Sequence, residues 1–361
     1  MYAAYGVASP FLPAFVNERG VPPEELGMVL AAGTAIRLIA APVAGRIGDR
    51  LRALRPVLVA CIALGATATL GYLPAHGFWL FLCLTLLHAA FLAPMPVLAD
   101  ALSLGAASRQ GFEYGRVRGA GSAAFIAGTL LSGQLVASYG LDAIVWSQAL
   151  LLLAAALAAR RVPELVHQPR ARRENRPLLL LRIPLFRNLV IVAALILGSH
   201  AMHDGFALIR WRSAGIDAPS ASVLWSLAVM AEVLVFFLLG PRLIAWLTPR
   251  GAIALAAAAA IVRWVVMALS ADLAALALVQ PLHGLTFALL HLACMRLIAR
   301  TVPDGLEGTA QAIYATVGIG AATALLTFAS GFLYSLAGAT GFFFMAALCA
   351  VALPLTLTLR A

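Results

Sequence analysis

Twelve ionisable side chains stand inside long apolar runs of this sequence, and their types define the chemistry that it could perform. They are four arginines, three carboxylic acids and five histidines: Arg37, Arg118, Arg263, Arg296, Asp100, Asp204, Glu232, His88, His200, His203, His283 and His291. A guanidinium offers a planar fork of donors that fits a carboxylate or paired hydroxyl groups. Acids and histidines can take up and release protons. Such a set suits the coupling of solute binding to proton movement.

Unlike charges occur on successive apolar runs, with Asp100 before Arg118 and Glu232 before Arg263. Consecutive elements are usually adjacent in space, so we expect each pair to neutralise itself inside a bundle. For Arg263, a purely structural salt bridge is an equally open interpretation.

The composition places these charges in a membrane. Of 361 residues, 63% are hydrophobic and 11% are charged, with a mean hydropathy of +0.96, whereas soluble domains have about 45–50% apolar and about 25% charged residues. This excludes a soluble enzyme, a disordered protein and a secreted disulfide scaffold. The cysteines stand apart within apolar runs, and His200, His203 and Asp204 would need further convergent ligands to hold a metal ion, so we expect neither a metal site nor a redox site.

Apolar runs broken by glycine, proline and charge predict an all-α protein with twelve transmembrane helices, each needing about 20 residues. The expected ranges are 1–17, 25–45, 56–75, 78–103, 115–138, 142–160, 187–209, 220–241, 251–270, 273–298, 309–335 and 339–359. The first is short for a span, and no signal peptide precedes it. We expect an N-terminal six-helix bundle over 1–160, a cytoplasmic central loop over 161–186 and a C-terminal six-helix bundle over 187–361.

The distribution of arginine predicts the orientation. All 25 basic residues are arginines, and they fall mainly in alternate loops on one side of the predicted helices. The positive-inside rule makes this side, and both termini, cytoplasmic in an inner membrane. Because the arginines form no single patch, we expect lipid and a small solute as partners, and no nucleic acid.

A weak internal repeat indicates duplicated halves. The pattern Ser132-Gly133-x-Leu135-x4-Gly140 recurs as Ser330-Gly331-x-Leu333-x4-Gly338. Duplicated halves around a central site are typical of secondary transporters. No phosphate-binding loop of the G-x-x-x-x-G-K-[ST] type is present, which argues against an ATP-driven pump.

Further stretches carry a family resemblance. Gly45-x-x-x-Asp49-Arg50 resembles the loop signature of the major facilitator superfamily, in which these residues form a conformational gate, although Arg52 stands where a second glycine is usual. Almost the whole chain resembles the phenylpropionate permease group, proton symporters for aromatic propionates. The stretches that carry this resemblance are Phe112–Arg118, Leu224–Leu227 with Ala231–Val233, Val262–Trp264, Leu282–Gly284 and His291–Arg296.

The chain is more distantly similar to lactose permease. This resemblance implies that Asp100 and Arg118 bind the solute and that Glu232 links the solute site to the proton site. Arg263 and His283 match proton-site residues.

The sequence also departs from lactose permease. Thr286 replaces the proton-releasing glutamate, Gln280 replaces a lysine and Ala207 replaces that lysine's acidic partner. We therefore assign proton coupling to Glu232, Asp204, His203 and His283, unless coupling is absent.

Together these observations predict a monomeric secondary active transporter that works by alternating access and needs no cofactor beyond a proton gradient. The expected solute is a small aromatic or hydrophobic carboxylate held by Arg118 and Arg263, with Phe125 and Trp225 available to stack on its ring. A proton-coupled sugar or glycoside permease is the alternative. A drug efflux antiporter is less favoured, because the fifth helix lacks a Gly-Pro element. A channel or a receptor without transport activity remains a further class.

Overall fold

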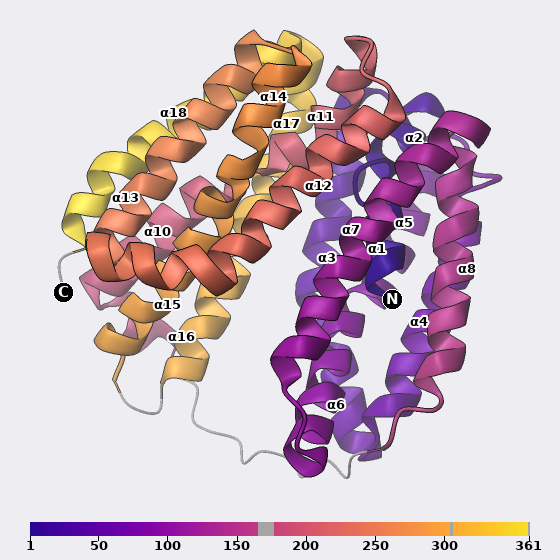
Figure 1. Ribbon diagram of the computed structural model, residues 1–361, viewed down its shortest axis with the longest axis horizontal. Coiled ribbons are helices and arrows are strands. Elements are labelled where there is room, and N and C mark those ends of the chain that lie inside the picture. The colour runs from indigo at the N-terminus through magenta and orange to yellow at the C-terminus, as the bar shows by residue number, and fades with distance from the viewer. Residues whose placement is uncertain (165–176, 304–305, 360–361) are drawn as a thin grey trace. The chain divides into compact units, whose positions relative to one another are not determined.

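The structure is a computed structural model that describes residues 1–164, 177–303 and 306–359. Within these ranges every regular element is a helix (Figure 1). This confirms the predicted all-α class. Most of the predicted central loop lies outside the described residues, so its bounds stay a prediction.

The described residues fall into two units, which are treated separately below. Unit 1 comprises Met1–Arg172 with Asp217–Ser222, and unit 2 comprises Arg173–Ile216 with Val223–Ala361. The helices of unit 1 are α1 (Tyr2–Ala8), α2 (Leu12–Glu18), α3 (Pro23–Leu51), α4 (Leu54–Leu70), α5 (Phe78–Leu92), α6 (Pro94–Gln110), α7 (Tyr114–Tyr139) and α8 (Asp142–Ala159).

Unit 2 contains both α-helices and π-helical segments. Its α-helices are α9 (Pro177–Leu181), α10 (Pro184–Gly198), α11 (Ala201–Ser213), most of α12 (Ala218–Leu234), α13 (Gly240–Leu269), α14 (Leu273–Val279), α15 (Leu290–Thr301), α16 (Glu307–Ile313), α17 (Ala322–Ala337) and α18 (Phe342–Leu355). The π-helical segments are η1 (Val235–Leu239), η3 (Gly284–Leu289) and η4 (Tyr314–Ala321). Short 3₁₀ turns are η2 (Gln280–Leu282), η5 (Gly338–Gly341) and η6 (Thr356–Thr358).

The helices of the described residues account for twelve crossings. Eight continuous segments are long and apolar enough to span a membrane, and two of these, Ala218–Leu269 and Glu307–Thr358, are 52 residues long. Because one crossing needs about 20 residues, each of the two provides a pair, divided at Thr248, whose φ is 64°, and at Gly338, whose φ is 54°. The apolar helix Leu54–Leu70 and the pair α1–α2 supply the remaining two.

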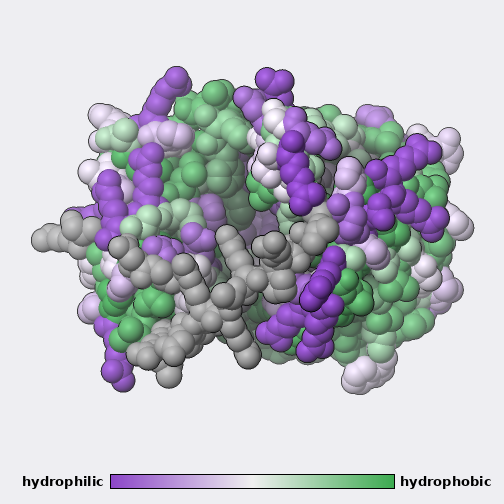
Figure 2. Space-filling view, turned by 90° about the horizontal axis from the view of Figure 1, so that it is seen from below, coloured by the Kyte–Doolittle hydropathy of each residue, from purple (hydrophilic) through white to green (hydrophobic). Residues whose placement is uncertain are grey.

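Several helices extend beyond the predicted spans. Helix α3 continues to Leu51 and α6 continues to Gln110, so that Arg46, Arg50 and Arg109 lie on helices and not in loops. Seen from below, hydrophilic side chains gather at the helix ends, beside hydrophobic flanks (Figure 2). A helix that leaves the hydrocarbon layer can keep its backbone hydrogen bonds in water, so the apolar run underestimates its length.

The internal repeat has a structural counterpart. Helices α7 and α17 end before Gly140 and Gly338, and these glycines have φ values of 76° and 54°. Glycine adopts such angles without steric cost. The repeated motif therefore marks equivalent helix ends in the two halves of the chain.

A second equivalence involves two arginines. In unit 1 the Arg19 guanidinium donates to the Leu73 carbonyl at 2.7 Å, beyond the end of α4. In unit 2 Arg210 donates to the Ser270 carbonyl at 3.0 Å, at the end of α13. Each cation compensates the partial negative charge at the C-terminus of a helix.

Backbone contact between α1 and α7 defines the interior of unit 1. A Cβ added at Gly6 would lie 2.0 Å from the Phe125 carbonyl oxygen, and one added at Gly128 would lie 2.2 Å from that of Ala3. The buried Thr129 hydroxyl donates to the Gly6 carbonyl at 3.0 Å. Glycine at both positions lets the two backbones touch.

Helix α12 begins with a polar cap. The Asp217 carboxylate accepts a hydrogen bond from the Ser220 backbone N–H at 2.8 Å. Hydrogen bonds from the side chain and backbone of Ser220 lower the pKa of this carboxyl. The charged form therefore satisfies a free N–H at the helix start.

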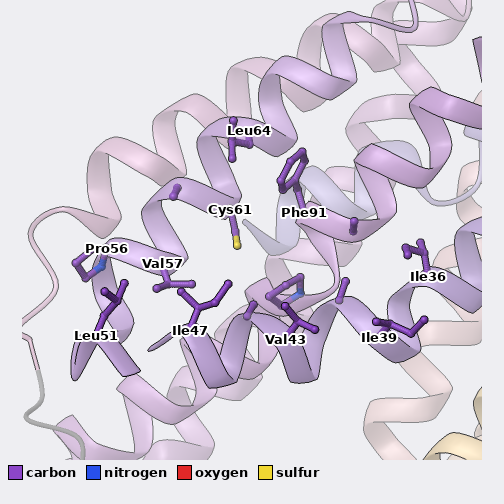
Figure 3. Close-up of a pocket in the computed structure, with 15 residues that line it drawn as sticks. Ile36, Ile39, Val43, Ile47, Leu51, Pro56, Val57, Cys61, Leu64 and Phe91 are labelled. Carbon is purple, nitrogen blue, oxygen red and sulfur yellow. The ribbon is translucent and has the colours of Figure 1, made fainter. Parts of the chain in front are cut away.

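Helices α3, α4 and α5 of unit 1 enclose an apolar groove of about 550 Å³, which continues to the start of α6 (Figure 3). Its lining contains no charged residue and includes Ile36, Val43, Cys61 and Phe91.

Candidate functional site

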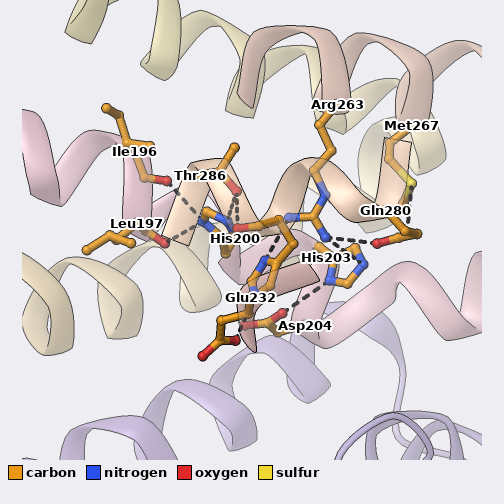
Figure 4. A network of polar contacts seen from close by, with 11 residues as sticks. Ile196, Leu197, His200, His203, Asp204, Glu232, Arg263, Met267, Gln280 and Thr286 are labelled. Carbon is orange, nitrogen blue, oxygen red and sulfur yellow. Dashed lines mark hydrogen bonds and ion pairs between the residues drawn. The ribbon is translucent and has the colours of Figure 1, made fainter. Parts of the chain in front are cut away.

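The centre of the polar network in unit 2 is Arg263, which lies on α13 and is 0% exposed. Its Nη1 donates to Nδ1 of His283 at 3.1 Å, and its Nη2 donates to Oε1 of Gln280 at 2.9 Å. Nη2 also lies 3.4 Å from Nε2 of His203 (Figure 4). The guanidinium carbon lies 4.6 Å from the centre of the Trp264 ring. The cation is thus held from several sides.

The hydrogen-bonding rules assign the protons of two histidines. A guanidinium can only donate, so the ring nitrogens that face Arg263 are acceptors, and each neutral imidazole carries its proton on the other nitrogen. In His283 that nitrogen, Nε2, lies 3.5 Å from Oε2 of Glu232. In His203 it is Nδ1, 3.2 Å from Oδ1 of Asp204. Each imidazole therefore connects the same buried cation to a different carboxylate.

A third histidine joins the network through Thr286. Nδ1 of His200 lies 3.1 Å and 3.2 Å from the carbonyl oxygens of Ile196 and Leu197, to which it donates. Its Nε2 then accepts from the Thr286 hydroxyl at 2.9 Å. Thr286 thus orients a histidine, and the acidic side chains of this network are Glu232 and Asp204.

The two carboxylates are more exposed than the cation. The side chain of Asp204 is 59% exposed and that of Glu232 is 25% exposed, whereas His203 is 4% exposed. We expected Glu232 to pair with Arg263, and the observed connection runs through His283. The two carboxylate side chains of the network are therefore at least partly exposed, whereas the cation to which the histidines link them is buried in the core of unit 2.

A glycine places Glu232 beside His283. A Cβ added at Gly284 would lie 2.6 Å from the carbonyl oxygen of Ala231, so the backbones of α12 and η3 are in contact there. The π-helical segment η1 directly follows α12, which holds Glu232, and η3 begins directly after His283. Such widened turns are frequent at functional sites.

In unit 1, the two charged candidates for solute binding, Arg118 and Asp100, are half-buried. The Arg118 guanidinium carbon lies 5.1 Å from the centre of the Tyr2 ring, and its Nη1 lies 3.4 Å from the Ser122 hydroxyl. Gly121 lets Tyr2 approach, because a Cβ there would lie 2.8 Å from the ring.

Asp100, on α6, interacts with Tyr114 at the start of α7. Among the ion pairs of the described residues none joins Asp100 to Arg118. The two charges are therefore not in ion-pair contact in this structure, although both interact with Tyr2 and Tyr114. The Arg118 guanidinium lies instead over the Tyr2 ring and near the Ser122 hydroxyl, which is one turn further along α7.

The two predicted aromatic residues differ in access. Phe125 is half-buried on α7. Trp225 is 7% exposed and stacks on His203 with ring centres 4.9 Å apart. Trp225 therefore packs against the polar network in this structure.

The gate residues Gly45, Asp49 and Arg50 lie in the last two turns of α3. The helix ends at Arg52, whose φ of 51° lies in the left-handed region. This explains why a glycine is favoured at this position in the family signature, since glycine adopts the angle at lower cost.

Two further residues of the network were not assigned a site role from the sequence. Gln280 is fully buried and binds Arg263, and His200 is oriented by Thr286. The one feature of the sequence that points to Gln280 is its polar amide side chain within an apolar run. No group of three or more His, Cys, Asp or Glu side chains in the described ranges could hold a metal ion.

The fold and these sites define a membrane transporter of the major facilitator type. Residues 1–345 match the family described as "MFS_1 like family", so the chain belongs to it. Its relatives are transporters and not enzymes. It is 32% identical over 358 residues to the "Probable 3-phenylpropionic acid transporter" of Escherichia coli, covering 98% of this chain and 93% of the relative. It is 26% identical to the maltose permease of Geobacillus stearothermophilus, over 92% and 85% of the two chains.

Solved structures agree with the fold. The nucleoside transporter NupG matches with a TM-score of 0.81 at 16% identity, covering 99% of this chain and 95% of that one. The human organic anion transporter MFSD10 matches with a TM-score of 0.64 at 20% identity, covering 98% and 96%. At these identities the likeness concerns the fold alone.

Proposed function

We propose that this transporter takes up a small aromatic or hydrophobic monocarboxylate together with protons, by alternating access. The observation that carries the proposal is the link from buried Arg263 through His283 to Glu232. The solute class is supported by the 32% identity to the protein named as a 3-phenylpropionic acid transporter.

In the proposed mechanism, unit 1 binds the solute. Arg118 is half-buried, and its guanidinium lies against an aromatic ring. A carboxylate can accept two parallel hydrogen bonds from such a fork, and the half-buried Phe125 ring on the same helix is available for apolar contact. The negative charge of Asp100 disfavours the binding of a second anion, and its carboxylate would accept a hydrogen bond from a protonated acid or a hydroxyl group. We assign solute binding first to Arg118, because Arg263 is fully buried.

In the proposed mechanism, unit 2 takes up and releases the protons. A proton on Glu232 removes a negative charge from the far side of His283 and so weakens the electrostatic hold on that ring. The same argument applies to Asp204 and His203. Because both imidazoles bind Arg263, protonation of either carboxylate changes the balance around one shared cation. Such a local charge change can favour one of two conformations.

The remaining assignments follow from the family and the charge pattern. Gly45, Asp49 and Arg50 form the conformational gate at the end of α3. The protein resides as a monomer in a bacterial inner membrane with both termini in the cytoplasm, as the arginine distribution indicates. Its partners are lipid, the solute and H⁺.

Uptake into proteoliposomes tests the proposal. With an inwardly directed proton gradient, 3-phenylpropionate should accumulate, and its uncharged analogue 3-phenylpropan-1-ol should not compete. Arg118→Gln should lower uptake at least tenfold, whereas Arg116→Gln is the matched control, because Arg116 is exposed and pairs with Glu113 of its own helix region. Uptake unaffected by Arg118→Gln would contradict the solute assignment.

A sugar permease is the second candidate, favoured by an acid and an arginine in the same unit and by the maltose permease relative. Maltose accumulation without 3-phenylpropionate accumulation in the same vesicles would decide for it. Downhill flux of either solute without accelerated exchange would indicate a channel.

A further inference from the structure

Two phenyl rings of unit 2 that the proposed mechanism does not use, Phe236 and Phe287, meet at nearly a right angle. Their ring centres are 6.5 Å apart and their planes are inclined by 76°. Phe236 lies in η1 and Phe287 in η3, so each ring is carried by a π-helical segment, a feature frequent at functional sites. Both side chains are half-buried, and part of each ring is therefore accessible. We call this pair the aromatic corner.

An imidazole packs against each ring of the aromatic corner. His283 stacks on Phe287, with ring centres 5.5 Å apart and planes inclined by 13°. His291 lies against Phe236, with ring centres 6.1 Å apart and planes inclined by 65°. The hydroxyl of Tyr314, which is 1% exposed, lies 3.3 Å from Nδ1 of His291 and holds that ring. The two phenyl rings are thus fixed from both ends.

The aromatic corner shares its helix faces with ionisable groups. Phe236 follows Glu232 by four residues, and Phe287 stands four residues from both His283 and His291. Residues four apart lie on the same side of a helix. The Glu232 and His283 side chains are 25% and 17% exposed, and ionisable groups at membrane depth face the bundle interior or water and not lipid. The accessible parts of the two phenyl rings therefore face the same space.

We propose that the aromatic corner is a specificity subsite that binds the aromatic ring of the transported acid. The proposal rests on the proposed function, which gives the solute its ring, and it concerns that ring and not the carboxylate. A third ring that stacks on one of two perpendicular rings meets the other edge to face, and both arrangements are favourable. Trp225, expected from the sequence to contact the ring, is 7% exposed and stacks on His203, so the corner takes this role in unit 2.

The subsite adjoins the polar network. The His283 ring that stacks on Phe287 also accepts a hydrogen bond from Arg263 and lies 3.5 Å from the Glu232 carboxylate. A solute ring in the aromatic corner therefore touches a side chain that packs directly on the proposed proton-coupling residues.

Uptake of two acids that differ only in their ring tests the subsite. Proteoliposomes receive equal low concentrations of 3-phenylpropionate and 3-cyclohexylpropionate, and the ratio of their initial uptake rates is measured. Phe236→Leu and Phe287→Leu should each lower this ratio about fivefold, because a saturated ring gains nothing from an aromatic partner. Phe287→Tyr keeps an aromatic ring and should keep the ratio. Both acids use the same protein in the same vesicles, so a smaller folded fraction does not change the ratio.

A matched variant and a photolabel complete the experiment. Phe237→Leu changes the next residue of η1, whose side chain is 56% exposed, and should leave the ratio unchanged. The probe 3-(4-azidophenyl)propionate carries its reactive group on the ring, and the labelled peptides are identified by mass spectrometry. We expect labels within 232–240 and 283–291, displaced by 3-phenylpropionate. The lipid-soluble 4-azidotoluene serves as the control for labelling from the hydrocarbon layer.

The outcomes separate the subsite from the proposed function. An unchanged ratio in both leucine variants, while 3-phenylpropionate still accumulates, overturns the subsite and leaves the proposed function standing. Labels confined to α7 also overturn it, in favour of a ring contact at Phe125. Labels at the corner that 4-azidotoluene reproduces and 3-phenylpropionate does not displace overturn it too, because that face would then contact lipid. Displaceable labels at the corner in a protein that fails to accumulate 3-phenylpropionate would support the subsite and refute the proposed function.

Discussion

The carboxylate of Glu232 and Nε2 of His283 lie 3.5 Å apart, while the opposite nitrogen of that ring accepts a hydrogen bond from buried Arg263. A neutral imidazole donates from one nitrogen and accepts at the other, so a change of charge at Glu232 is transmitted through the ring to Arg263. His203 makes the same kind of link to Asp204.

Glu232→Gln should separate proton coupling from solute exchange. The amide keeps the size of the side chain but cannot gain or lose a proton near neutral pH. We expect uptake driven by a proton gradient to fall at least tenfold, while exchange between two equal solute pools stays within about twofold. Both are measured in proteoliposomes.

Glu113→Gln is the control, since the Glu113 side chain is 74% exposed. If gradient-driven uptake survives in the double variant Glu232→Gln with Asp204→Asn, the assignment of Glu232 and Asp204 as proton carriers is wrong.

Arg263→Lys should destabilise the protein although it preserves the charge. An ammonium group cannot replace a planar fork that binds His283 and Gln280 at once. Breaking a buried charge network typically costs about 3–5 kcal/mol, so we expect a clear fall in thermal stability in detergent. Arg296→Lys, at an exposed position, should change stability by less than about 0.5 kcal/mol. Equal stability of the two variants would show that the network is not a structural unit.

Arg118→Ala should abolish stabilisation by the solute without unfolding unit 1. A ligand at 100 times its Kd stabilises a protein by about 2.7 kcal/mol, and the variant should lose this increment in a thermal-shift titration with 3-phenylpropionate. Tyr2→Phe should keep it, because the ring under the guanidinium remains. A full ligand-induced shift in Arg118→Ala would place the solute elsewhere.

Gly128→Ala should loosen the contact between α1 and α7. The new methyl group would lie 2.2 Å from the Ala3 carbonyl oxygen, and overpacking of this kind costs about 1–3 kcal/mol. Gly119→Ala is the matched control on the same helix, because a Cβ there meets nothing within 4 Å, and alanine favours a helix by up to about 1 kcal/mol over glycine. Thermal unfolding of the two variants should therefore move in opposite directions.

The sequence predicted what depends on hydrophobicity and local backbone preference. Apolar runs located the crossings, and the repeated glycines marked equivalent ends of α7 and α17. The boundaries of α3 and α6 were wrong by several residues, because their last turns are polar yet remain helical. Hydropathy measures the hydrocarbon layer and not the length of the helix.

The site was predictable as a set of residues but not as a set of contacts. Glu232, His283 and Arg263 were expected in one unit because they are ionisable groups within successive spans of the C-terminal half. That an imidazole separates the acid from the arginine depends on side-chain conformation and on the backbone contact at Gly284. Likewise, Arg118 turns to Tyr2 and not to Asp100 because α1 packs directly on α7.

Arg52→Gly should stabilise the end of α3. Arg52 has a φ of 51°, and its N–H bonds the Asp49 carbonyl at 3.2 Å while that of Ala53 bonds Gly48 at 3.1 Å. This helix end requires a left-handed residue, which costs a non-glycine side chain about 1 kcal/mol or more. Part of the gain is offset by the greater freedom of glycine in the unfolded chain, so we expect a net gain of about 0.5–1 kcal/mol in thermal unfolding. Arg50→Gly, within the helix, should instead destabilise by about 1 kcal/mol. A loss of stability in Arg52→Gly would mean that the arginine side chain makes a contact worth more than the backbone strain that it causes.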